Sequence, residues 1–324
     1  MKKKEDSSPP PKSSSLLPDL SRLSFGRPSL SAGGGGAAPL PPQPPSVKFS
    51  GVASTTMSKL EEGDSPEGKV HHWMPCLAST FVTRIGPAYA RNKQKAPSPD
   101  ALMELCGVDL VRTPSRIDNL GARVTFPDDF FSVPSPLPGV PSLFIVNCQV
   151  PQEFPTSIFT DITDGPGWSI AYYFRLTSTT RDFLSDLANA PAAVKLFAAY
   201  CMEAPELDHD PKSKWKGKFK AMYRCENMEQ FGLPSFITSY NAKPVLINKT
   251  GSLVRGERYI EMDINLHRFS SMAKKGLQIL IPYFSEMTVS CGFTIESEAD
   301  DEMPETLFGC ASTIKGSHKN AQDV

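Results

Sequence analysis

The sequence has no excess of charge of either sign, and this excludes one large class of binding proteins. It contains 34 Lys and Arg against 35 Asp and Glu, which gives a formal net charge of −1. Sequence-independent binding to nucleic acid depends on an excess of basic side chains that neutralise phosphates. We therefore expect no nucleic-acid partner, and any anionic partner needs a local basic patch.

Long apolar runs and paired cysteines are also absent. No segment approaches the roughly 20 consecutive apolar residues of a membrane-spanning helix, so we expect no transmembrane segment. The seven cysteines are far apart and lack the Cys-x-x-Cys or Cys/His spacings of zinc sites. They are Cys76, Cys106, Cys148, Cys201, Cys225, Cys291 and Cys310. We predict free, mostly buried thiols, no metal and a cytoplasmic location.

Motifs for catalysis are missing as well. The chain has no Gly-x-Ser-x-Gly, no phosphate-binding loop and no Gly-x-Gly-x-x-Gly, and its five histidines are scattered. Glu261 and Asp263 would lie about 7 Å apart on one strand face, a separation that suits an acid and base pair. The same alternation is typical of the solvent face of an amphipathic strand, which we favour. We predict a protein that is not an enzyme and has no cofactor.

The composition of the chain changes at about residue 70. Residues 1–70 are rich in serine, glycine and proline, with a proline-rich stretch at Pro39–Pro45. Such a segment buries too little to offset the entropy lost on ordering. We predict a disordered tail over 1–70, a folded domain over 71–318 and a flexible C-terminus over 319–324.

The first 70 residues also raise the question of targeting. The stretch from Ser7 to Thr56 is serine-rich and contains almost no acid, as in organelle transit peptides. Glu5, Asp6 and the abundant prolines argue against that interpretation. We favour a cytoplasmic protein, with peripheral membrane association as a further option.

Strands and helices are predicted in blocks within the folded domain. Leu143–Val150 and Trp168–Leu176 have the composition of an antiparallel strand pair. Tyr259–Leu266 alternates apolar and polar residues, which is typical of a half-buried strand. Further strands are expected at 219–225, 235–240, 245–247, 288–295 and 307–314, and helices that begin at Thr179 or Thr180, at Pro191 and at Ser270 or Ser271. This order predicts an α+β fold with a largely antiparallel sheet and a few helices.

One basic segment has a pattern above the background. Five lysines occupy every second position from 212 to 220, and Trp215 and Phe219 are among the residues between them. The candidate lipid-binding residues are Lys212, Lys214, Trp215, Lys216, Lys218 and Lys220. In an extended chain the five ammonium groups share one face, and each contributes about 1 kcal/mol near an anionic bilayer. The alternative is an edge strand or solvated loop whose lysines prevent unwanted pairing.

Five short motifs occur in a fixed order along the predicted domain. They are Phe81–Tyr89, Gly107–Leu110, Val146–Pro151, Tyr259–Ile264 and Leu307–Gly309. In this order and spacing they resemble the C-terminal domain of the plant enhanced disease resistance 2 proteins. The resemblance covers roughly residues 72–316.

The resemblance implies a domain to which its family assigns no biochemical activity. Larger family members carry a phosphoinositide-binding pleckstrin homology domain and a lipid-binding START domain ahead of it, and are associated with restraint of cell death and defence. This chain has room for neither module and resembles the short, stand-alone members. We therefore expect a regulatory module that binds anionic lipid or an apolar ligand. The alternative is an adaptor that recruits protein partners through the Pro/Ser-rich tail.

Overall fold

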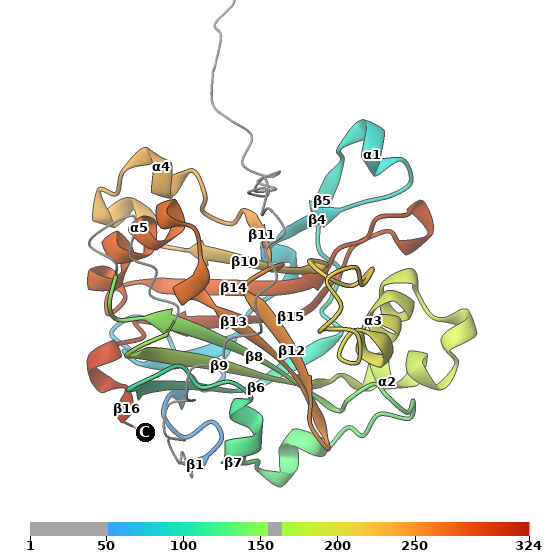
Figure 1. The fold of residues 1–324 in the computed structure, drawn as a ribbon, viewed down its shortest axis with the longest axis horizontal. Coiled ribbons are helices and arrows are strands. Elements are labelled where there is room, and N and C mark those ends of the chain that lie inside the picture. The colour runs from blue at the N-terminus through green and yellow to red at the C-terminus, as the bar shows by residue number, and fades with distance from the viewer. Residues whose placement is uncertain (1–50, 155–163, 324) are drawn as a thin grey trace, which may run out of the picture. The chain divides into compact units, whose positions relative to one another are not determined.

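Two six-stranded sheets form the framework of the protein (Figure 1). The computed structural model describes residues 51–154 and 164–323. The first sheet has the order β11 (Pro244–Leu246), β10 (Phe219–Cys225), β14 (Thr288–Ile295), β15 (Leu307–Ile314), β3 (His72–Pro75) and β2 (Ser58–Lys59). The second has the order β12 (Gly251–Arg255), β13 (Tyr259–Asn265), β8 (Leu143–Pro151), β9 (Gly167–Leu176), β6 (Met103–Thr113) and β16 (Gln322–Asp323).

Most strand pairs in the two sheets are antiparallel. β8 pairs with β9 in the antiparallel register expected from the sequence. The parallel pairs are β13 with β8, β16 with β6, and β2 with β3. Two small ribbons accompany the sheets, β1 (Gly51–Val52) with β7 (Val124–Thr125) and β4 (Val82–Arg84) with β5 (Lys95–Pro97). The predicted α+β class with largely antiparallel sheets is confirmed.

The space between the sheets is filled by aromatic rings. Phe144 and Phe174 project from the second sheet, and Phe219, Phe293 and Phe308 project from the first. Ring centroids lie 4.8 Å apart for Phe144 and Phe308 and 5.8 Å apart for Phe174 and Phe293. Such close packing of large buried side chains is the main stabilising contact between the two layers.

The second sheet is covered on its other face as well. A loop over residues 114–131, here called the cover loop, packs Leu120 and Phe130 against Leu143, Ile145 and Tyr173. The central strands β8 and β13 are therefore buried on both faces. The prediction that Tyr259–Leu266 is only half-buried is wrong, because alternation shows which residues share a face but not what covers it.

In the described part of the chain, five α-helices lie at the ends and edges of the sheets (Figure 1). They are α1 (Tyr89–Asn92), α2 (Ser178–Ser185), α3 (Ala192–Glu203), α4 (Ser235–Thr238) and α5 (Ser271–Leu280). The predicted starts of α3 at Pro191 and of α5 at Ser270 are confirmed within one residue. The start predicted at Thr179 or Thr180 is wrong, because the hydroxyl of Thr177 caps α2 and both residues lie inside that helix. The strand predicted at 235–240 is wrong, since Pro234 starts a short helix there.

The folded part of the chain begins before the predicted boundary at residue 71. Residues 51–60, here called the strap, bury Ala53, Met57 and Leu60. They supply β1 and β2, and Leu60 N donates a hydrogen bond to Trp73 O at 2.8 Å. The prediction of a disordered tail differs from the structure over the strap, while its part on residues 1–50 lies outside the described residues.

Candidate functional site

The lysine-rich segment lies between α3 and β10 and is not extended. Residues 211–217 form successive turns, and Lys216 N donates to Ser213 O at 3.0 Å. Gly217 takes a φ of +81°, a left-handed conformation that favours glycine. The extended stripe predicted for Lys212–Lys220 is therefore wrong, because a chain in turns does not send alternate side chains to two opposite faces.

Trp215 is the buried anchor of this segment. Its ring packs edge-on against Tyr200 of α3, with 5.6 Å between the ring centroids. Its Nε1 donates to Glu203 Oε2 at 3.0 Å, and Lys214 Nζ lies 4.7 Å from the indole centroid. The aromatic side chain predicted to reach a lipid surface instead holds the turns against α3.

Four of the five lysines are paired with acidic side chains. The pairs are Lys214 with Glu203 at 2.8 Å, Lys216 with Asp208 at 3.1 Å, Lys218 with Glu298 at 3.3 Å and Lys220 with Glu305 at 2.5 Å. Within the described part of the chain, Lys212 makes no ion pair through its side chain. Compensated charges attract an anionic surface less than free ones, so this geometry weakens the basis of the lipid prediction.

Lys220 is part of a buried network of two cations and two acids. Its ammonium group also lies 3.4 Å from Glu296, and Arg84 reaches both Glu296 at 2.6 Å and Glu305 at 3.7 Å. Burial lowers the pKa of Lys220, while the neighbouring carboxylates Glu305 and Glu296 oppose that shift. The network joins β4 to β10 and to the residues that flank β15, which is a structural role.

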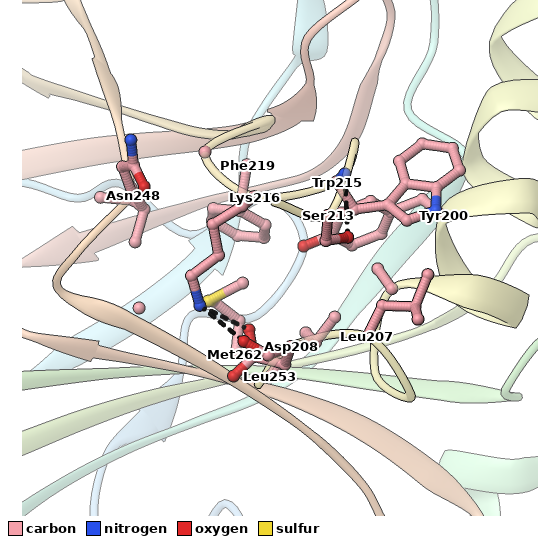
Figure 2. Close-up of a pocket in the computed structure, with 14 residues that line it drawn as sticks. Tyr200, Leu207, Asp208, Ser213, Trp215, Lys216, Phe219, Asn248, Leu253 and Met262 are labelled. Carbon is pink, nitrogen blue, oxygen red and sulfur yellow. Dashed lines mark hydrogen bonds and ion pairs between the residues drawn. The ribbon is translucent and has the colours of Figure 1, made fainter. Parts of the chain in front are cut away.

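A small pocket lies beside the lysine-rich turns (Figure 2). Lys216 crosses its mouth toward Asp208, and Leu253 and Met262 of the second sheet form the apolar wall. Its cavity volume is about 20 Å³, which is room for one or two water molecules. The pocket is too small for the acyl chain of a lipid.

A second cluster of functional side chains lies on the covered face of the second sheet. Glu261 and Asp263 of β13 are both fully buried beneath the cover loop. The interpretation of their strand face as solvent-exposed is therefore wrong. Asn147 of β8 pairs directly with Asp263 across the parallel ladder, so the sheet register brings the amide and the two carboxylates together.

The two carboxylates bind three consecutive backbone amides of the cover loop. Asn119 N donates to Asp263 Oδ2 at 2.9 Å, and Leu120 N and Gly121 N donate to Glu261 at 2.8 and 2.7 Å. Asn119 has a φ of +53°, which turns these N–H groups to one side. Successive amides in such a turn form a concave anion site, and here two carboxylates of the same chain occupy it.

Burial controls the protonation of this pair. Desolvation raises the pKa of Glu261, and desolvation together with the neighbouring Glu261 charge raises that of Asp263 well above its usual range. Asn147 Nδ2 donates to Asp263 Oδ1 at 2.7 Å and carries no charge. His267 at the end of the same strand has its pKa lowered by burial to about 4, so it is neutral at pH 7. A proton shared by the two acids reduces their repulsion.

The covered acid pair could have been inferred from one sequence signal. Asn147 and Gln149 interrupt an otherwise apolar strand at alternate positions, on the face that carries Ile145 and the acid pair. Polar residues at regular positions of a central strand indicate a second polar network above the sheet. The cover loop that completes this network has no regular pattern that would have placed it there.

The described residues also bear on metals and membranes. Across 51–154 and 164–323, no group of three or more His, Cys, Asp or Glu side chains is arranged to hold a metal ion. None of the helices in this part of the chain is both long and apolar enough to cross a membrane. All seven cysteines are free, five of them buried and two partly exposed, as predicted.

The comparison with protein families decides the relationship of the chain. The family described as Protein ENHANCED DISEASE RESISTANCE 2, C-terminal, matches residues 73–315. This chain belongs to that family. The match spans the first sheet from β3 to β15 and most of the second sheet, and it ends just beyond β15. No curated protein and no solved structure gave a significant match.

Proposed function

We propose that this member of the enhanced disease resistance 2 C-terminal family is a non-catalytic regulatory module that binds a protein partner at its surface. The observation that carries the proposal is a run of exposed apolar side chains between residues 236 and 246. These are Phe236 and Tyr240, both about two-fifths exposed (42% and 43%), and Val245 and Leu246 of the edge strand β11, whose side chains leave the strand toward opposite faces. We call these four residues the 236–246 surface.

A surface site is favoured because the two spaces described among residues 51–154 and 164–323 are too small for an apolar ligand. The contact between the sheets is occupied by the rings of Phe144, Phe174, Phe219, Phe293 and Phe308. The pocket near Lys216 admits only water-sized molecules. A carrier of lipid chains needs a closed apolar cavity, whereas a binding module needs only an accessible face.

A non-catalytic role is supported by how the titratable groups are used. The acid pair of β13 is saturated by backbone amides of the cover loop. The Lys220 network is likewise satisfied within the fold. Catalytic acids and bases need access to substrate, and these groups lie beneath other elements.

The chemistry around the 236–246 surface favours a protein over an anionic membrane. Lys243 stacks on Tyr240, with 5.3 Å from its Nζ to the ring centroid. Glu229 and Glu286 are exposed, and each lies within three residues along the chain of the ring contact between Phe231 and Tyr283. Aromatic residues with a rim of both charges are typical of protein interfaces, whereas anionic bilayers select for an excess of Lys and Arg.

The regulatory part of the proposal comes from the family. Its name refers to disease resistance, and we propose that the partner links this chain to defence and cell-death control. The second candidate is an adaptor in which the Pro39–Pro45 stretch recruits the partner. The two differ in which substitutions abolish binding.

The test is affinity capture with the full chain, followed by binding measurements with the purified partner. Substitution of Phe236 and Tyr240 by serine should weaken binding at least tenfold, because exposed aromatic residues at the centre of an interface commonly contribute 1 to 2 kcal/mol or more each. Leu77→Ser is the matched control, since Leu77 is an exposed apolar residue (77%) outside this surface.

Three outcomes separate the hypotheses. Loss of binding only in the Phe236/Tyr240 variant supports the proposal. Loss only when the prolines of Pro39–Pro45 are replaced supports the adaptor. Flotation of the wild-type chain with anionic liposomes, abolished by the same two serine substitutions, would show that the 236–246 surface is a membrane site.

A further inference from the structure

Two cysteines far apart in the sequence face each other on neighbouring strands. Cys310 lies in β15, and Cys76 directly follows β3. The antiparallel register pairs Ala311 with Pro75, so the next pair along the ladder is Cys310 with Cys76. Both cysteines project to the outer face of the first sheet, because Trp73 and Ala311 at odd-numbered positions belong to the core between the sheets.

The backbone hydrogen bonds show which kind of pair this is. His71 N donates to Lys315 O at 3.1 Å, so positions 71 and 315 are a hydrogen-bonded pair. In an antiparallel pair of strands, hydrogen-bonded and non-hydrogen-bonded residue pairs alternate. The pairs 73/313 and 75/311 are therefore hydrogen-bonded, and the pair 76/310 is non-hydrogen-bonded. Directly opposed residues of that kind have Cα atoms about 4.5 Å apart, within the range that a disulfide spans.

The sulfur atoms are already in each other's surroundings. The Cys310 thiol donates to the Cys76 carbonyl oxygen at 2.9 Å. Hydroxyl groups complete the site, with Thr80 Oγ1 3.9 Å from Cys76 Sγ, and Ser312 contributes to the lowering of the Cys76 pKa. Neither cysteine needs a change of fold to reach the other.

The two thiols differ in exposure and in pKa, as an attacking cysteine and its resolving cysteine do. Cys76 is partly exposed, and hydrogen bonding by the Cys310 thiol lowers the pKa of Cys76 to about 6. Cys310 is buried, and its pKa is raised by the neighbouring Cys76 and by burial. Cys106, the other partly exposed cysteine, has its pKa raised by burial. The thiolate that forms at neutral pH is therefore on Cys76.

We propose that Cys76 and Cys310 are a redox-responsive pair that closes to a cross-strand disulfide when the protein meets a hydroperoxide. The Cys76 thiolate attacks the peroxide O–O bond, forms an S–O bond and releases hydroxide, which takes up a proton to give water in the case of hydrogen peroxide. The resulting sulfenic acid is attacked by Cys310, which forms the S–S bond and releases water. Two thiols are oxidised and one hydrogen peroxide is reduced to two waters.

The disulfide would covalently link β15 to β3 near the edge of the first sheet. β3 carries β2 of the strap on its other side, so β15, β3 and the strap become one covalently tied unit. The bond would join residues 234 positions apart, which restricts the unfolded chain strongly. We expect the oxidised protein to melt at a higher temperature than the reduced protein and to release the strap less readily.

The test uses the purified full chain with hydrogen peroxide as the oxidant and peptide mapping as the readout. We expect a mass loss of about 2 Da that dithiothreitol reverses, and one cross-linked peptide pair that contains Cys76 and Cys310. Cys310→Ser should stop the reaction at the sulfenic acid, which dimedone traps on Cys76. Cys106→Ser is the control and should oxidise like the wild type.

Several results would overturn the proposal. One is a wild-type chain whose seven cysteines all stay reduced at peroxide doses that oxidise free cysteine. Another is oxidation of Cys76 straight to sulfinic acid with Cys310 unmodified. Mapping of the wild-type protein needs no variant, so the proposal can fail even if Cys310→Ser does not fold.

Discussion

At the scale of single residues, Lys220 is buried although the alternating lysine pattern predicted an exposed side chain. Its side chain is 4% exposed and pairs with Glu305 and Glu296, whereas the side chain of Lys214 is 62% exposed and pairs with Glu203. Removing one partner of a buried ion pair leaves the other charge uncompensated. Two lysines of the same alternating pattern therefore have different roles.

We predict that Lys220→Met lowers the free energy of unfolding by about 3 kcal/mol. Lys214→Met is the matched control and should change it by less than about 1 kcal/mol, because exposed ion pairs contribute little. Urea denaturation of the two variants measures both values. Equal stability of the two variants would contradict the assignment of Lys220 to a structural network.

The acid pair of β13 leads to a prediction about pH. The folded-state pKa of Asp263 is raised, so the folded protein binds more protons than the unfolded one above about pH 4, the usual pKa of Asp. Stability is then full below that pH and is lost as pH rises toward the folded pKa, by up to about 1.4 kcal/mol per pH unit for one proton.

Asp263→Asn should remove this part of the pH dependence. Compared with the wild type, the variant should be least stable at pH 4 to 5, because it loses a hydrogen-bond acceptor, and should recover relative to wild type as pH rises. Denaturation at several pH values measures the difference, with the exposed Glu257→Gln as control. A wild-type minus variant difference that does not change with pH would argue against a shared proton.

At the scale of elements, one carboxylate binds the middle of the strap, between its strand contacts β1 and β2. Asp109 of β6 is buried and accepts hydrogen bonds from Ser54 N at 2.6 Å, Thr55 N at 3.0 Å, and both the amide and hydroxyl of Thr56 at 3.0 and 2.9 Å. The hydroxyl of Tyr173 also donates to it at 3.0 Å. This single buried side chain accepts hydrogen bonds from four donors of three consecutive strap residues, which are partly buried or exposed.

Asp109→Ala should therefore detach the strap without unfolding the sheets. We expect amide hydrogen exchange of residues 54–56 to lose its protection, since each unsatisfied buried donor costs about 1 to 3 kcal/mol and undocking exposes all of them to water. The amides of β8 and β9 should stay protected. Asp128→Ala in the cover loop, where the side chain is exposed, serves as control. Unchanged protection at 54–56 would show that the strand pairing and apolar contacts of the strap hold it without Asp109.

On the scale of the whole molecule, the strap determines where the smallest stable fragment of the chain begins. A chain that starts at residue 51 retains Met57 and Leu60 in the core, while one that starts at 71 loses them and β2. Burial of each such side chain contributes about 1.5 to 3 kcal/mol. We predict a Tm clearly lower for 71–324 than for 51–324, and limited proteolysis that stops near Gly51. Equal Tm values would instead support the domain boundary predicted from the sequence, at residue 71.

Local physical rules were enough to predict many of the strands and helices of this protein from its sequence. The strands at 143–150, 168–176, 288–295 and 307–314, and the helix starts after Pro191 and Ser270, depend on alternation, turn residues and caps, which act within a few positions along the chain. The family relationship could likewise be inferred from short motifs in order.

The tertiary structure alone decided which faces are covered and which charges meet. Glu261 and Asp263 are buried because a loop some 140 positions away in the sequence lies over their strand. Lys220 is buried because Glu305 reaches it from 85 positions away. Cys76 faces Cys310 because two distant strands pair in one register. Periodicity shows which side chains share a face, but contacts between distant segments depend on the packing of the whole chain.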